Sequence, residues 1–165
     1  MTVGLPKVTV RYLFGSLVVA IVITVCRTVA GADGKQPIGP PKEFAASIGG
    51  FLGRSYWVKW NGKTLEYVVA DSTADYNTPR TKEQIVVAPD QWTRFWREVD
   101  NAKVWSWHKR YEDPNVADGT VWSIELKESG KNSRRASSSG ANSYSPNFGK
   151  FTTAVEALLG GKPFR

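Results

Sequence analysis

The residues best suited to chemistry gather in the stretch VWSWHKRYEDPNVADGTVWS, residues 104–123. It holds three of the chain's seven tryptophans and its only histidine, His108. A histidine can act as a general acid or base, and aromatic rings can stack on sugars or nucleic-acid bases. The stretch is therefore a reactive site, a binding surface or the interior of a small fold.

Catalysis by His108 requires a nucleophile and an orienting acid within hydrogen-bond reach. Asp113 and Asp118 are the candidate acids, and serines are frequent between 133 and 145. The chain has no Gly-x-Ser-x-Gly motif and no second histidine. We therefore predict no catalytic residue, and a small hydrolase using His108 and Asp118 is the alternative.

Binding by stacking requires exposed rings. If residues 104–111 are extended, Trp105, Trp107 and Tyr111 share one face and could form a platform for sugar rings or bases. The same side chains could instead cover the apolar face of a helix. Large aromatic side chains in regular elements are mostly buried, so we favour the core role and keep the platform as an alternative.

A basic, serine-rich stretch follows, KNSRRASSSGANS at 131–143. Arg134 and Arg135 could contact an anionic partner. Such a stretch is more often a solvated hairpin, because exposed charges gain little from pairing, and this is the role that we expect.

Regular elements must position these side chains, and the sequence predicts several short strands. A β-hairpin is expected over 55–71, because β-forming residues flank the turn dipeptide Asn61-Gly62. The strand over 119–130 alternates, with Trp122, Ile124 and Leu126 on one side. Two further strands are expected, over 84–88, which Pro89 ends, and over 134–144 as a polar return strand.

Two amphipathic helices are predicted, over 89–102 and 146–161. The apolar stripe of the first consists of Trp92, Phe95, Trp96 and Val99. The stripe of the second consists of Phe148, Phe151, Val155 and Leu158/Leu159. The pair Gly160-Gly161 ends the second helix, and Pro163 follows.

The two helical segments, PDQWTRFWREV and SPNFGKFTTAV, align with one another, and each follows a predicted hairpin. The predicted fold class is α+β, with an antiparallel sheet built from two hairpin–helix units and both helices on one face. Residues 51–165 are expected to form a single domain of this kind.

Residues 1–32 have the features of a signal peptide. Lys7 and Arg11 precede a 14-residue apolar run over 12–25, and Ala30-Gly31-Ala32 supplies small residues for cleavage. The run is short for a helix that must cross about 30 Å of hydrocarbon. We predict export to the periplasm or secretion. The alternative is an N-terminal anchor, with membrane contact only through 12–25 if the segment is uncleaved.

The segment 33–50 is rich in proline and glycine at its start and is expected to be a flexible linker. The hexapeptide AASIGG, residues 45–50, is at most one short helical turn, so order is expected to begin near Phe51.

Cleavage would remove Cys26 and leave a cysteine-free mature domain without disulfides or thiolate metal ligands. We predict no cofactor and no metal, because one histidine remains and ADSTAD at 70–75 lacks the spacing of a calcium loop. Residues 33–165 carry 19 basic and 15 acidic residues, a net charge of +4. This charge is too small for a dedicated nucleic-acid binder.

One series of residues resembles a known pattern. The series is Trp105-x-Trp107, Tyr111, Asp118-Gly119-x-x-Trp122, Gly140-x-Asn142-x-Tyr144 and Pro146-x-Phe148. It is similar to the motifs of a family of small uncharacterised bacterial exported proteins, over roughly Trp92 to Leu159. Ser145 separates Tyr144 from Pro146 here, whereas the two adjoin in the family.

No activity, cofactor or partner comes with this resemblance. It implies that Asp118, Trp122, Gly140, Asn142 and Tyr144 belong to one constellation. In it, Asn142 and Asp118 either fix loop backbones through side-chain hydrogen bonds or line a pocket.

Together these observations predict an exported, non-enzymatic binding or interaction domain at the cell envelope, with a protein or a glycan as its partner. Besides the hydrolase, the alternative is a carbohydrate- or polyanion-binding module that uses exposed tryptophans. The candidate binding residues are Trp105, Trp107, His108, Tyr111, Asp118, Trp122, Arg134, Arg135, Asn142 and Tyr144.

Overall fold

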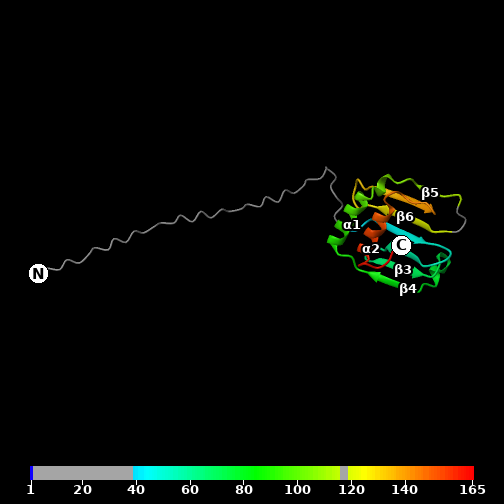
Figure 1. Ribbon diagram of the computed structural model, residues 1–165, viewed down its shortest axis with the longest axis horizontal. Coiled ribbons are helices and arrows are strands. Elements are labelled where there is room, and N and C mark those ends of the chain that lie inside the picture. Colours follow the sequence, from blue (N-terminus) through cyan, green and yellow to red (C-terminus); the bar gives the residue numbers. More distant parts are fainter. Residues whose placement is uncertain (2–38, 116–118) are drawn as a thin grey trace. The chain divides into compact units, whose positions relative to one another are not determined.

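The computed structural model describes Met1 and residues 39–115 and 119–165. Asp118 and the predicted signal peptide beyond Met1 lie outside the described residues. From residue 39 onward, seven strands and two α-helices form an α+β architecture, as predicted (Figure 1). Within these ranges, no helix is both long enough and apolar enough to cross a membrane.

The strands form one sheet in the order β4-β3-β2-β1-β6-β7-β5. All neighbouring strands are antiparallel except β5 and β7, which are parallel. The strands are β1 (Glu43–Gly49), β2 (Ser55–Trp60), β3 (Leu65–Ala70), β4 (Thr81–Ile85), β5 (Arg110–Glu112), β6 (Val121–Lys127) and β7 (Arg135–Ala141). Two short 3₁₀ helices, η1 (Thr73–Asn77) and η2 (Val104–Ser106), lie in the connections.

Both predicted helices are confirmed. Helix α1 spans Pro89–Asn101, and the side chain of Gln91 accepts a hydrogen bond from the backbone N–H of Ala88 at its start. Helix α2 spans Phe148–Leu158. The predicted apolar stripes of both helices are buried. After α2, Gly160 and Gly161 adopt positive φ angles of 70° and 86°, which glycine tolerates best, and the helix ends there.

The helices pack against one face of the sheet. On β6, Trp122, Ile124 and Leu126 point into the core, and the residues between them point away, as the alternation predicts. On the opposite face, Ser47 of β1 and Ser123 of β6 have hydroxyl oxygens 2.8 Å apart. The same face carries Trp57 of β2, which packs on Tyr76 of η1, and the buried Val68 of β3. The main core lies between the sheet and the helices.

The segment predicted as a linker contains the central strand. β1 pairs with β2 on one side and with β6 on the other, which corrects the expected helical turn at 45–50 and the expected start of order near Phe51. The glycine at the end of β1 has a steric reason. A Cβ on Gly49 would lie 2.0 Å from Oγ of Ser55, so a larger residue would separate β1 from β2.

The hairpin over 55–71 is confirmed as β2 and β3, but its turn differs from a tight two-residue turn. Only Gly62 has a positive φ angle, and Oδ1 of Asn61 accepts backbone hydrogen bonds from Lys63 and Thr64. The strand expected at 84–88 lies three residues earlier in the structure, where β4 spans Thr81–Ile85.

Residues 104–111 are extended only in part, so the condition for a platform on one face of a strand is not met. Val104–Ser106 form the 3₁₀ helix η2, and only Arg110–Glu112 form a strand, β5, beside β7. The return strand β7 and its antiparallel pairing with β6 are confirmed. The two hairpins supply four of the seven strands, and β4 stands between the first hairpin and α1, so two hairpin–helix units do not account for the whole sheet.

The chain after α2 is held against β3 by Tyr67. This side chain is 3% exposed, and its hydroxyl donates a hydrogen bond of 2.7 Å to the carbonyl oxygen of Pro163. Burial, with smaller contributions from Tyr56 and Glu83, raises the pKa of Tyr67 from 10.0 to about 12. The neutral phenol is therefore part of the folded state.

We predict a specific loss of stability in alkali. Because the folded pKa of Tyr67 exceeds the unfolded value, its contribution is complete below pH 10 and is lost between pH 10 and about 12. Tyr67→Phe should lower the free energy of unfolding by about 1 kcal/mol near pH 8. Above pH 10 the difference between the two proteins should become smaller, because only the unmodified chain has a phenol to titrate. Urea unfolding at pH 8 and pH 11 measures both effects. A deficit that does not change with pH would contradict the assignment.

Candidate binding site

Trp122 is the centre of an aromatic cluster at one end of the sheet. It is 2% exposed, and its Nε1 donates a hydrogen bond of 2.8 Å to the carbonyl oxygen of Ser143. Four rings surround it at centroid distances of 4.6–6.4 Å: Phe148, Tyr111, Trp107 and Tyr144. Trp122 is therefore a core residue, and the rings around it form the wall between core and surface.

The other two tryptophans of the 104–123 stretch also pack onto the core. Trp107 is half-buried, contacts Phe151, and donates from Nε1 to the carbonyl oxygen of Ala102. Trp105 stacks on Trp96. None of the chain's seven tryptophans is an exposed side chain, so the structure offers no flat tryptophan platform.

Arg134 belongs to a charged cluster beside Trp105. Its guanidinium lies 4.4 Å from the centroid of the Trp105 ring and donates hydrogen bonds to the carboxylates of Asp100 and Glu128. The Glu128 side chain is 8% exposed. These acceptors raise the pKa of Arg134 despite its partial desolvation. Arg135, in contrast, is exposed and lies 3.7 Å from Glu43.

This contrast predicts unequal effects on stability. Arg134→Gln leaves the buried Glu128 carboxylate without its charged partner and should lower the free energy of unfolding by about 2 kcal/mol. The matched control Arg135→Gln should cost less than about 0.5 kcal/mol. Urea denaturation measures both variants. Adding Glu128→Gln to Arg134→Gln should recover part of the loss. Equal effects of the two arginine variants would contradict the structural role of Arg134.

The residues of the family-like series meet on both sides of Trp122. A Cβ on Gly140 would lie 2.3 Å from Nε1 of Trp122. Asn142 has a φ angle of 56°, its backbone N–H donates to the carbonyl of Thr120, and its side chain occupies the space where Gly119 would carry a Cβ. The structure therefore brings Trp122, Gly140, Asn142 and Tyr144 together.

The close approach at Gly140 is testable. Gly140→Ala should displace the Trp122 indole and lower the free energy of unfolding by about 2 kcal/mol. Gly149, in the first turn of α2, has open space around its Cα, so Gly149→Ala should raise stability by up to about 1 kcal/mol. Thermal unfolding followed at the tryptophan near-ultraviolet band measures both. A tolerated Gly140→Ala would show that the indole can move freely.

Two adjacent hollows open where the aromatic cluster reaches the surface. The first, here called the aromatic recess, has a volume of about 410 Å³, and its lining includes Lys103, Ser106, Trp107, His108, Tyr111 and Asn147. The second, the Tyr144 recess, has a volume of about 390 Å³, and its lining includes Thr120, Tyr144, Phe148, Thr152 and Arg165. Ser145, just before α2, lines both, so the two hollows share a wall.

The polar groups of the aromatic recess come from separate elements. Lys103 follows α1 and adopts a left-handed φ angle of 55°, while Asn147 precedes α2. The backbone N–H of His108 donates to the Tyr111 hydroxyl, and its carbonyl accepts from Ser138. Sequence reasoning found Trp107, His108 and Tyr111 but missed Lys103, Ser106 and Asn147, because their approach depends on the connection through η2 and on the start of α2.

The His108 side chain is exposed and lies 5.7 Å from the Tyr111 ring, centroid to centroid. Among the described residues, no hydroxyl or carboxylate is hydrogen-bonded to its imidazole. Ser106 donates to the carbonyl of Lys103 instead. Over the same residues, no three histidine, cysteine, aspartate or glutamate side chains group closely enough to hold a metal ion.

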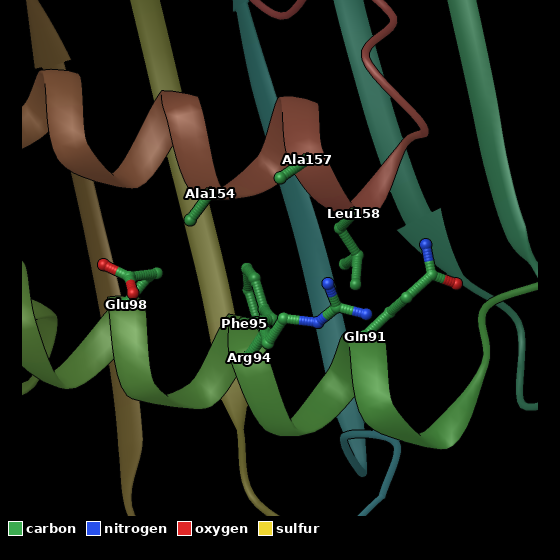
Figure 2. Close-up of a pocket in the computed structure, with 7 residues that line it drawn as sticks. All are labelled: Gln91, Arg94, Phe95, Glu98, Ala154, Ala157 and Leu158. Atoms are coloured by element: carbon green, nitrogen blue, oxygen red, sulfur yellow. The ribbon is translucent and has the colours of Figure 1, made fainter.

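Two other hollows are less suited to a ligand. A groove of about 110 Å³ separates α1 from α2, where Ala154 and Ala157 face Phe95 and Arg94 (Figure 2). Arg94 is paired there with Asp90 of its own helix. A larger hollow, of about 550 Å³, lies on the polar face of the sheet, and its lining consists mainly of serines of β6 and β7 with Lys109 and Glu125. The first is small, and the second has no aromatic side chain in its lining.

No known protein family matches this chain, and no curated protein sequence is significantly similar to it.

Proposed function

We propose that this chain is an exported, non-enzymatic binding domain that acts at the cell envelope or outside the cell, and that it binds a glycan in the aromatic recess and the adjoining Tyr144 recess. The observation that carries the proposal is the aromatic recess itself. There, Trp107 and Tyr111 border a hollow together with the polar groups of Ser106, His108 and Asn147. Export is proposed from the signal-peptide features of residues 1–32.

The size and lining of the recesses support a small ligand. Each is within the range of about 300–1,000 Å³ that ligand sites occupy. Aromatic carbon surface suits the apolar face of a sugar ring, and the amide and hydroxyl groups suit its hydroxyls. Tyr144 is the most accessible ring of the cluster, with 42% of its surface exposed.

The unfavourable backbone conformations of two residues also favour a functional site at this end of the sheet. Among the described residues, Lys103 and Asn142 are the non-glycine residues with positive φ angles. Lys103 lines the aromatic recess, and Asn142 precedes Tyr144 by two positions. Such conformations are unfavourable and are often retained at functional sites, where the surrounding structure holds them.

The hydrolase alternative rests on His108 and Asp118. His108 shares the aromatic recess with Ser106 and Ser145, but Ser106 is bonded to the Lys103 carbonyl and Asp118 lies outside the described residues. The polyanion alternative has less support at Arg134, because this side chain is already engaged by Asp100 and Glu128. Binding without turnover is the function that this arrangement supports best.

The test is a binding screen of the full chain on immobilised neutral and acidic oligosaccharides, followed by titration of each bound sugar with tryptophan emission as the readout. Tyr144→Ala should weaken binding by about tenfold, the effect expected from loss of one stacking ring. Tyr76→Ala is the matched control, because Tyr76 is 40% exposed and packs on Trp57, outside both recesses. The affinity of Tyr76→Ala for the sugar should equal that of the unmodified chain.

Equal losses in the two tyrosine variants, or no binding to any sugar, would contradict the proposed site. Cleavage of a bound oligosaccharide that disappears in His108→Ala would instead establish the hydrolase.

A further inference from the structure

We infer that the sugar bound in the aromatic recess carries a carboxylate, as in a uronic acid, and that Lys103 pairs with it. This inference rests on the proposed function and adds the chemical class of the ligand. It follows from the charges that line the recess and from the way in which the backbone holds Lys103.

The lining of both recesses contains cations and no acidic side chain. Lys103 is exposed and forms no ion pair with any described residue. Two neighbouring arginines are paired, Arg110 with Glu112 at 2.8 Å and Arg134 with Asp100 at 2.7 Å. Lys109 forms no ion pair with a described residue either, but it lines the hollow on the polar face of the sheet and not this recess. Asp100, the acid nearest to Lys103 along the chain, also accepts from Nε1 of Trp105. Lys103 is therefore available to an external anion.

Hydrogen bonds fix the backbone of Lys103 before any ligand arrives. Its N–H donates to the carbonyl of Asp100 at 2.9 Å, and its own carbonyl accepts from both the N–H and the hydroxyl of Ser106. The left-handed conformation at this position starts the η2 turn that also places Trp107. A cation on a rigid turn loses less conformational entropy on binding than one on a flexible loop.

The start of α2, which lines the same recess, also favours a negatively charged ligand. Pro146 and Asn147 lie at the start of α2, and no side-chain hydrogen bond caps this helix. The partial positive charge of the first turn adds to that of Lys103. A carboxylate paired with Lys103 would leave the sugar ring to Trp107 and Tyr111, which line the same recess and offer apolar surface. A carboxylated sugar matches both features, whereas a neutral sugar uses only one.

The test compares trigalacturonate with its methyl ester, which keeps the rings and removes the charge. Isothermal titration of the full chain should give about tenfold tighter binding of the acid, since an ion pair adds a charge-assisted hydrogen bond. Lys103→Gln should reduce this preference to less than about threefold. The matched control Lys63→Gln, an exposed lysine in the β2–β3 turn, should keep it. Raising the salt concentration should weaken binding of the acid more than that of the ester.

Each other outcome has a distinct meaning. Equal affinities for acid and ester would overturn the inference and leave the proposed glycan site intact. A preference for the acid that persists in Lys103→Gln would also overturn it, because the charge would then be recognised elsewhere. If neither compound binds a chain whose near-ultraviolet circular dichroism shows ordered tryptophans, the inference fails, and the oligosaccharide screen decides the proposed function separately.

Discussion

The pairing of β1 with both β2 and β6 is the interaction on which the rest of the structure depends. Without it, the strands β2–β4 and the strands β6, β7 and β5 would be two separate ribbons. A ribbon of three short strands offers a narrower apolar face, which two helices cannot both cover. By joining them, β1 creates one surface broad enough for two helices, and Phe44, Ala46 and Ile48 contribute its central row of core residues.

The aromatic cluster has two roles because of where it lies. Trp122 and Phe148 complete the core at the end of the sheet, while Trp107, Tyr111 and Tyr144 extend from them toward solvent. The recess walls are therefore packed against core side chains. Well-packed support of this kind lets a small domain hold a ligand without a large loss of conformational entropy.

The cations on the two sides of the η2 connection differ in whether acidic side chains surround them. On the Trp105 side, Arg134 is enclosed by two carboxylates and an aromatic face, which makes it a structural cation. On the Trp107 side, Lys103 lines an opening whose lining has no acid. Composition alone makes Arg134 and Lys103 equivalent, and only their surroundings separate the structural cation from the one that is available to a ligand.

Local periodicity in the sequence determined both helices, the inward face of β6 and the hairpin of β2 and β3. These elements carry their own signal, since 3.6-residue spacing of large apolar side chains or strict alternation specifies which face is buried whatever the partner. The stripe of Trp92, Phe95, Trp96 and Val99 is the clearest case.

Tertiary structure decided β1, β5 and most of the candidate site. The small residues of AASIGG have weak local preferences, and they form a strand because β2 and β6 supply hydrogen-bonding partners. Ser55 leaves no room for a side chain at position 49, which requires the glycine there. The parallel pairing of β5 with β7 and the shared recess of Lys103 and Asn147 bring together residues far apart in the chain. Such contacts depend on the energy of the whole packed arrangement, which no short window of sequence contains.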